Sequence, residues 1–180
     1  GYQGNQNAAP GPVLPPIIFN PPESLLLPGE TQVWGAVAGA GEAWGGCEVW
    51  ISADGDSYRM VQSIYGRSRI GRLTAPLPPG SDPDTTNNLA VQLSVADQLT
   101  AATTAEADSG ATLCWIDGEL VSYRDAILTG PGAYNLQYLR RGRLGSSVAN
   151  HPADASFVRL DDAIWKYSYT ADQIGHTVWV

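Results

Sequence analysis

Short alternating runs of apolar and polar residues, interrupted by glycine and proline, dominate this 180-residue chain. It contains 20 glycines and 13 prolines, which favour turns and end helices. Valine, threonine, tyrosine and tryptophan recur in the runs between them, and these residues suit half-buried strands. We therefore predict an all-β, mainly antiparallel fold. It is expected to be β-sandwich-like or to consist of two small packed β-subdomains, with at most one short helix.

The alternation also places individual strands. We expect strands over residues 32–38, 47–52, 58–64, 71–78, 89–95 and 163–174, and around Trp115, Val121, Tyr134 and Phe157. Residues 96–110 stay open between a loop and a short helix. Asp54-Gly55 and Asp117-Gly118 are typical of hairpin turns, and the first pair suits a type I′ geometry.

Composition divides the chain into three parts. Residues 1–22 are rich in glycine, asparagine and proline and predict a linker, or a docking segment laid as a strand against its own domain or a neighbour. Residues 23–105 are expected to form a first β-subdomain and residues 106–180 a second one. Because the chain starts at Gly1 and stops in a strand-like run, we expect a piece of a longer polypeptide.

Charge narrows the classes of partner. The formal net charge of −8 argues against nucleic acid, because phosphate recognition needs a clustered basic face. One dense basic cluster, Arg140, Arg141 and Arg143, is expected to pair with nearby acids such as Asp161 and Asp162. No run is long and apolar enough to predict a membrane span, and no signal-peptide pattern is present.

Residues typical of catalytic or metal sites are sparse. His151 and His176 are not at metal-ligand spacing, and no nucleophile elbow occurs. Cys47 and Cys114 lie in apolar runs and are interpreted as buried thiols, with a bond between them left open. Turn chemistry explains most of the paired carboxylates, which are Asp54 with Asp56, Asp82 with Asp84, Asp117 with Glu119, and Asp161 with Asp162. We predict no enzymatic activity, no metal and no cofactor.

Tryptophan is the residue type best suited to surface recognition. Most of the six tryptophans lie in apolar alternation and are expected in the core. Trp44 lies in a glycine-rich loop and is predicted to be exposed. It is therefore the candidate contact for a glycan or a protein partner.

Several motifs follow one another in the second half of the chain. They are Asp117-Gly118-Glu119, a Tyr-x-Leu-x-x-Leu strand over Tyr134 to Leu139, an Arg-Gly-x-x-Gly loop over Arg141 to Gly145, His151, and Phe157 to Asp161. Their order resembles the phage tail-tip or host-specificity family, which includes gene-transfer-agent baseplate hub proteins. The resemblance extends upstream to residues 49–58 and 71–77, so it covers most of residues 45–180.

This resemblance implies a structural domain of a phage or prophage tail-tip or baseplate hub protein, acting in tail assembly and host attachment. The implied partners are other tail or baseplate proteins, with a homo-oligomer for the full-length protein. The implied location is the virion, at the tail tip or baseplate, after synthesis in the bacterial cytoplasm. The alternative is a carbohydrate-binding module that recognises a host-surface glycan through Trp44.

Six residues are expected to shape the Arg-Gly loop. Arg141, Gly142, Arg143 and Gly145 would fix it at a domain junction, and the two glycines permit positive φ. His151 is expected to position backbone there. Asp161 is the predicted ionic partner of one of the arginines, and the pair to test is Arg141 with Asp161.

Overall fold

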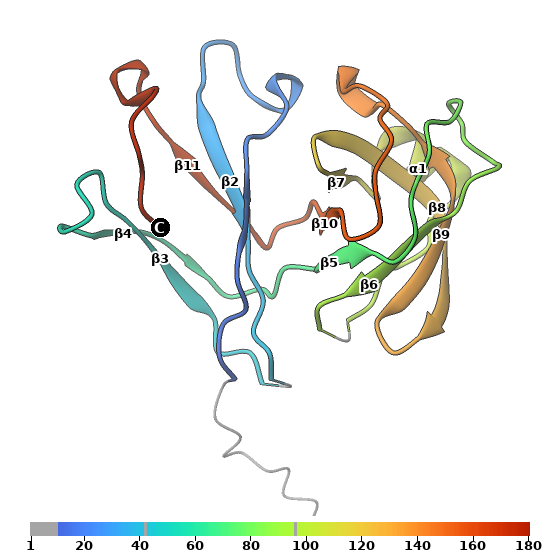
Figure 1. The fold of residues 1–180 in the computed structure, drawn as a ribbon, viewed down its shortest axis with the longest axis horizontal. Coiled ribbons are helices and arrows are strands. Elements are labelled where there is room, and N and C mark those ends of the chain that lie inside the picture. The colour runs from blue at the N-terminus through green and yellow to red at the C-terminus, as the bar shows by residue number, and fades with distance from the viewer. Residues whose placement is uncertain (1–10, 42, 96) are drawn as a thin grey trace, which may run out of the picture.

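Antiparallel strands make up most of the computed structural model, which describes residues 11–41, 43–95 and 97–180 (Figure 1). The strands are β1 (Ile17–Phe19), β2 (Gln32–Ala36), β3 (Cys47–Ile51), β4 (Arg59–Ile64), β5 (Ile70–Leu73), β6 (Leu89–Leu93), β7 (Cys114–Ile116), β8 (Glu119–Gly130), β9 (Ala133–Arg140), β10 (Ser156–Arg159) and β11 (Ile164–Ser168). One short α-helix, α1 (Thr104–Ser109), and the 3-10 turns η1 (Glu23–Leu25), η2 (Arg143–Gly145) and η3 (Ala171–Gln173) complete the described elements. The prediction of an all-β, mainly antiparallel fold with at most one short helix is confirmed for these residues.

Six strands close into a barrel in the order β10-β5-β6-β9-β8-β7. Alternation along each strand fills its interior. On β6, for example, Leu89, Val91 and Leu93 are buried, whereas Gln92 faces solvent. Because the barrel is closed, each of its strands has a paired neighbour on both sides, although β7 pairs with only the first three residues of the longer β8, residues 119–121.

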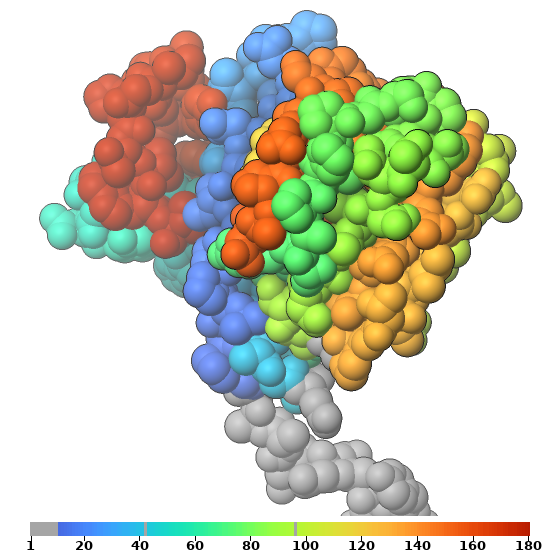
Figure 2. All heavy atoms as spheres, turned by 45° about the vertical axis from the view of Figure 1, so that its right-hand side comes forward, coloured from blue at the N-terminus to red at the C-terminus, as the bar shows by residue number. Residues whose placement is uncertain are grey.

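The remaining strands form a second lobe. The sheet β1-β2-β11 packs against the hairpin β3-β4 through an apolar cluster that includes Val49, Ile51, Trp165 and Tyr167. Gly35 on β2 lets the ring of Trp165, its partner on β11, lie against the sheet, because a Cβ there would lie 2.2 Å from that ring. In Figures 1 and 2 this lobe, coloured blue, teal and red, lies beside the green-to-orange barrel.

A third apolar cluster joins the two lobes. Ile70 and Val158 from the barrel are buried with Phe19 and Trp34 from the second lobe. The ring of Phe19 also stacks on that of Trp115 in β7, with 4.5 Å between their centroids. The lobes therefore share buried surface.

The described part of the N-terminal segment lies against its own domain. Strand β1 pairs with β2, and Val13 bridges Gly39. Residues 1–10 of the predicted segment lie outside the described residues. The predicted division between residues 105 and 106 separates β5 and β6 from β7 to β10, and the barrel takes strands from both sides of it.

Helix α1 settles the choice left open for residues 96–110. The Thr103 hydroxyl accepts a hydrogen bond from the Glu106 N–H, and the Glu106 carboxylate accepts one from the Thr103 N–H. This capping box starts the helix, and Gly110, in the left-handed region at φ 86°, ends it.

Several local predictions need correction. The type I′ prediction for Asp54-Gly55 is wrong, because only Gly55 has positive φ and the Asp54 carboxylate instead accepts the Asp56 and Ser57 N–H groups. Strand β5 stops at Leu73 rather than continuing to residue 78, and β11 stops at Ser168, where η3 follows.

The described cysteines and helices can be compared with the predictions directly. Cys47 and Cys114 are both free thiols, and only Cys114 is fully buried.

Within residues 11–41, 43–95 and 97–180, no helix has the length and apolar character needed to cross a lipid bilayer.

Candidate functional site

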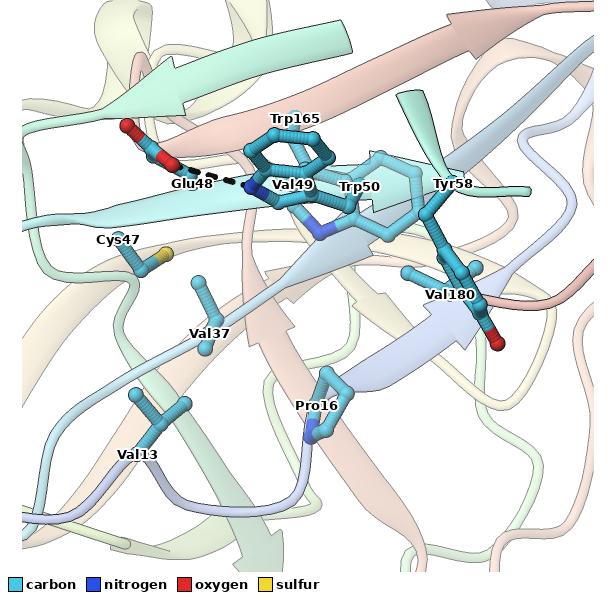
Figure 3. Close-up of a pocket in the computed structure, with 10 residues that line it drawn as sticks. All are labelled: Val13, Pro16, Val37, Cys47, Glu48, Val49, Trp50, Tyr58, Trp165 and Val180. Atoms are coloured by element: carbon cyan, nitrogen blue, oxygen red, sulfur yellow. Dashed lines mark hydrogen bonds between the residues drawn. The ribbon is translucent and has the colours of Figure 1, made fainter. Parts of the chain in front are cut away.

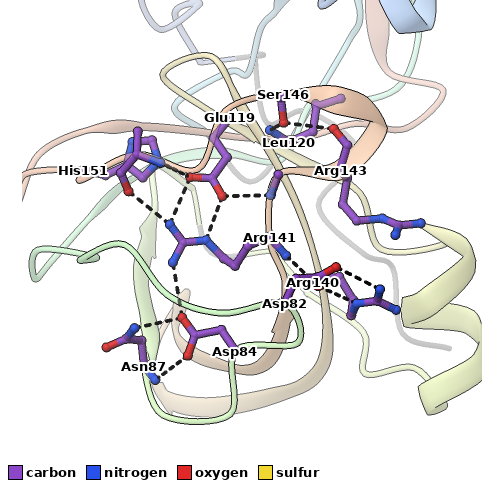
Figure 4. Close-up of polar contacts among 12 residues, drawn as sticks. Asp82, Asp84, Asn87, Glu119, Leu120, Arg140, Arg141, Arg143, Ser146 and His151 are labelled. Atoms are coloured by element: carbon purple, nitrogen blue, oxygen red, sulfur yellow. Dashed lines mark hydrogen bonds and ion pairs between the residues drawn. The ribbon is translucent and has the colours of Figure 1, made fainter.

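Arg141 lies at the centre of a buried cluster of charged side chains at one end of the barrel (Figure 4). Glu119 is the first residue of β8, Asp84 comes from the loop between β5 and β6, and His151 from the segment before β10. The side chains of Arg141 and Glu119 are 0% exposed, and those of Asp84 and His151 are 1% and 2% exposed. Four segments that are distant in sequence therefore meet at this cluster.

An irregularity in β9 turns Arg141 inward. Tyr134 and Leu136 are buried in simple alternation, but the next buried residue is Leu139, so the phase shifts by one residue. The shift occurs at Tyr138, which has φ 52°. As a result Arg141 is buried, whereas the preceding Arg140 stays partly exposed.

A left-handed backbone is unfavourable for a residue as large as tyrosine, at a cost of order 1 to 3 kcal/mol. Two contacts hold the Tyr138 side chain in place. The Arg124 guanidinium lies over its ring at 4.7 Å from the centroid, and its hydroxyl donates to Asp108 Oδ1 at 3.4 Å. Tertiary contacts thus favour a conformation that the local sequence does not.

Every N–H of the Arg141 guanidinium has an acceptor. Nε and Nη2 donate to the two carboxylate oxygens of Glu119 at 2.7 and 3.0 Å. Nη1 donates to the Pro78 carbonyl at 3.0 Å and to Asp84 Oδ2 at 3.3 Å, and Nη2 also donates to the Ala149 carbonyl at 3.1 Å. This arrangement uses the planar fork of arginine fully, which lysine could not do.

Glu119 is equally well satisfied. Besides Arg141, its oxygens accept from the N–H groups of Gly142 at 3.1 Å and Ala149 at 3.0 Å, and from His151 Nε2 at 2.8 Å. Burial by itself raises the pKa of Glu119, but the hydrogen bonds from His151, Arg141 and Ala149 outweigh it and lower the pKa to about 2. Because an ionised carboxylate only accepts, His151 carries a proton on Nε2.

Asp84 stabilises the loop that precedes β6. It accepts from the N–H groups of Thr86 and Asn87 and from the Asn87 side-chain amide. Burial raises its pKa, but these hydrogen bonds and the charge of Arg141 lower it overall. The charge of Asp84 also helps to raise the pKa of Arg141, against the opposite effect of burial.

The Arg-Gly loop is held on both sides. Gly142 and Gly145 have φ of 57° and 80°, as predicted, and Leu144 has φ 52°. Arg143 Nη2 donates to the Asp108 carbonyl at 2.7 Å, and the Ser146 hydroxyl donates to the Arg143 carbonyl while accepting from the Leu120 N–H. The turn η2 of this loop lies next to η1 of the second lobe.

His151 makes backbone hydrogen bonds as well as its side-chain contact with Glu119. Its N–H and C=O pair with those of Leu77 at 2.9 and 2.8 Å. The ring is buried and donates to Glu119. His151 therefore connects the segment before β10 both to Leu77, which follows β5, and to the ion cluster.

Asp161 is not a partner of the arginine cluster, and that prediction is wrong. Its carboxylate pairs with Arg69 at 2.7 Å and accepts from the Ala163 N–H. Arg140 instead pairs with Asp82 and Asp108, each at 2.6 Å. Barrel topology, not proximity in sequence, decides these pairings.

The burial of Glu119 had a signal in the sequence. Glu119, Val121 and Tyr123 fall on one face of an alternating strand, and the latter two are clearly interior residues. A carboxylate on such a face needs a buried cation or donors. Asp84, in a polar loop, had no comparable signal.

Trp44 is half-buried, so the prediction of an exposed side chain is wrong. It packs against the apolar cluster of the second lobe. The backbone of Gly39 lies close to its ring, since a Cβ there would meet the indole at 2.8 Å. Trp50 and Trp179 are the more exposed tryptophans, at 45% and 40%.

The charged groups of the cluster are paired, hydrogen-bonded and buried. Among the residues that the structure describes, no group of three or more His, Cys, Asp and Glu side chains is placed to hold a metal ion.

Comparison with known proteins identifies one family. A family model described as "Rcc01698-like, C-terminal" matches residues 68–158. The match begins just before β5 and ends within β10, so it spans the barrel and its ion cluster. No curated protein matches the chain.

A double-mutant cycle should detect the central ion pair. Arg141→Met and Glu119→Gln are each expected to destabilise the fold by about 3 to 5 kcal/mol, because each leaves a buried charge or donors without a partner. Together they should cost less than the sum of the two, with a coupling free energy above about 1 kcal/mol in urea unfolding. The matched cycle of Arg141→Met with Asp161→Asn should be additive. Coupling in the second cycle and not in the first would contradict the assignment.

Glu119 should also make stability depend on pH. Its pKa is about 2 in the folded protein against an ordinary value of 4.5, so its stabilisation is present above pH 4.5 and is lost as the pH falls toward 2. The difference in unfolding free energy between wild type and Glu119→Gln should shrink by roughly 3 kcal/mol over that interval. Chemical unfolding at several pH values measures it, and a difference that stays constant from pH 6 to 2 would refute the role of the Glu119 charge.

Proposed function

This chain belongs to the Rcc01698-like, C-terminal family, and we propose that it is a structural, non-enzymatic domain of a phage or prophage tail-tip or baseplate hub protein. It would act in tail assembly and host attachment, in the virion, after synthesis in the bacterial cytoplasm. The proposal starts from the order of the motifs between Asp117 and Asp161, which resembles that of tail-tip and baseplate hub proteins.

The observation that carries the proposal is where those motifs meet. Glu119 of the Asp-Gly-Glu motif, Arg141 and Gly142 of the Arg-Gly loop, and His151 join in one buried, fully hydrogen-bonded cluster. A domain whose most distinctive polar residues are consumed in holding loops together suits a scaffold better than a catalyst. Enzymes keep a reactive group accessible to substrate.

The second lobe supports a role in assembly. We infer that its sheet β1-β2-β11 and hairpin β3-β4 form a small sandwich-like subdomain, and the barrel a second one. Strand edges that are open in this lobe can pair with a neighbouring polypeptide. The proposed partners are other tail or baseplate proteins, with a homo-oligomer for the full-length protein.

Immunogold electron microscopy tests this function. An antibody against the purified chain should label the distal tail of phage or transfer-agent particles released by the strain that encodes it. Particles from a strain in which the coding region is deleted serve as the control. Abundant protein in the cells with no label on intact particles would contradict the proposal.

A second candidate function is recognition of a host-surface glycan. Trp50 and Tyr58 are 45% and 46% exposed and line one cavity, and aromatic rings of this kind can stack on sugars. These residues replace Trp44, which is half-buried, as the proposed contact.

A glycan array tests this alternative. If it is right, the purified chain binds at least one glycan saturably, Trp50→Ala abolishes that binding, and Trp44→Ala lowers stability more than it lowers affinity. Binding that survives Trp50→Ala, or no binding across the array, would remove this candidate.

A further inference from the structure

Strand β3 has an outer edge that is only partly used. One edge of β3 pairs with β4, and the opposite edge is the outer edge. Along the outer edge, within the described part of the chain, Ser52 just beyond β3 pairs with Trp179, each N–H donating to the other's carbonyl at 3.0 Å. This antiparallel bridge shows that the edge accepts a second backbone.

Alternation extends the edge along β3. Since the N–H and C=O of Ser52 face outward, those of Trp50 and Glu48 do so as well. The irregularity of the β3-β4 pairing does not interrupt this pattern, because its extra residue, Val61, lies on β4 between the partners of Val49 and Trp50. The outer edge of β3 thus presents two further residues for backbone pairing.

A cavity of about 260 Å³ lies beside this edge (Figure 3). Its lining includes Val13, Pro16, Val37, Val49, Trp165 and Val180. Pro16 has no N–H to offer a strand, so an occupant's backbone would pair with β3. Val180 lies at the end of the cavity, where the register of the Trp179 bridge places it opposite Ile51.

That register defines what the cavity would receive. Residues directly opposite each other in an antiparallel pair point to the same face of the sheet. Ile51 and Val49 are both buried on the inner face. A strand paired along the outer edge would therefore point its residue opposite Val49 into the cavity. Val49 lies two residues before Ile51, which Val180 faces, so this residue is the next one on the same face after Val180.

Size and chemistry favour a peptide side chain over a small molecule. Small-molecule sites usually measure about 300 to 1,000 Å³ and carry several converging polar groups. This cavity is smaller and mainly apolar in lining, and the nearest carboxylate, that of Glu48, accepts from Trp50 Nε1 at 3.0 Å. One or two aliphatic side chains would fill it.

We propose that the outer edge of β3 binds an extended, antiparallel strand of a partner polypeptide. The partner's backbone pairs with Glu48 and Trp50, and an aliphatic side chain opposite Val49 fills the cavity. Residues beside Trp50 and Tyr58 on the outer face of the same strand stay polar or small. This inference relies on the proposed function only for the identity of the partner, since the edge and the cavity stand on geometry.

A designed peptide tests the edge directly. The probe is acetyl-Thr-Val-Thr-Val-Lys-amide, with threonines opposite Trp50 and Glu48 and valines opposite Val49 and Cys47, because Val180 already occupies the position opposite Ile51. At about 1 mM it should slow hydrogen exchange of the Glu48 and Trp50 amides in NMR spectra. It should also slow iodoacetamide labelling of Cys47, which lines the cavity, by about tenfold. Cys114 is an internal control, because it is fully buried and burial raises the pKa of its thiol to about 12.

Two controls separate backbone pairing from apolar adhesion. The same peptide with N-methylated threonines keeps its side chains and loses its donors, so it should give no protection. Trp50→Pro removes the indole and an outward-facing backbone N–H, a loss that edge strands tolerate, and should abolish protection. Trp50→Thr removes the indole and keeps the N–H, so it should retain protection. If Trp50→Pro does not fold, the N-methylated peptide decides.

Three results would overturn the proposal. They are no protection by the parent peptide, equal protection by the N-methylated one, or a dimer in light scattering that Trp50→Pro abolishes, which would assign the edge to a second copy. None of these affects immunogold labelling of particles. Failure of the strand proposal and failure of the proposed function can therefore be told apart.

Discussion

The bidentate contact between Arg141 and Glu119 is the interaction on which the closed end of the barrel depends. It connects the start of β8 to the residue that follows β9, and through Asp84, Ala149 and His151 it reaches two further segments. Burying these charges is costly, and apolar residues of similar volume can be as stabilising as a buried pair. The arginine fork differs from an apolar contact in its directionality. Each N–H donates only to an acceptor that lies in its own direction, so the cluster specifies which loops meet and at what spacing.

The same end of the barrel shows where local preference yields to tertiary structure. Tyr138 occupies a left-handed conformation that a tyrosine disfavours, and Leu144 does so in the Arg-Gly loop. The first of these shifts the phase of β9 so that Arg141, and not Arg140, enters the interior. Arg140 is then free to bind Asp82 and Asp108 at the rim. Backbone strain at one residue thus sorts two adjacent arginines into different roles.

Sequence patterns predicted what is local and missed what is long-range. Period-two alternation places most strands correctly, because burial of one face is a property of consecutive residues. Barrel closure depends on pairs such as Gly71 with Phe157, which no local pattern encodes. The same limit explains the error at Asp161. Nearness in sequence favoured the arginines at 140–143, whereas the pairing of β5 with β10 brings Arg69 to it. Trp44 was misjudged because the glycines around it were interpreted as an open loop, and they instead let the backbone of Gly39 approach the ring.

The two lobes differ in what they leave available to a partner. In the barrel each strand has a paired neighbour on both sides, and the charged side chains of the cluster are paired with one another. In the second lobe, the outer edge of β3 lies beside a mainly apolar cavity, and the aromatic residues Trp50 and Tyr58 are among the residues that line this cavity. The family match covers residues 68–158, which is the barrel, and leaves the β3-β4 hairpin outside. A division of roles follows from this arrangement. The shared apolar cluster of Ile70, Val158 and Phe19 joins the second lobe to the barrel, and we propose that the second lobe carries the surface that binds a partner.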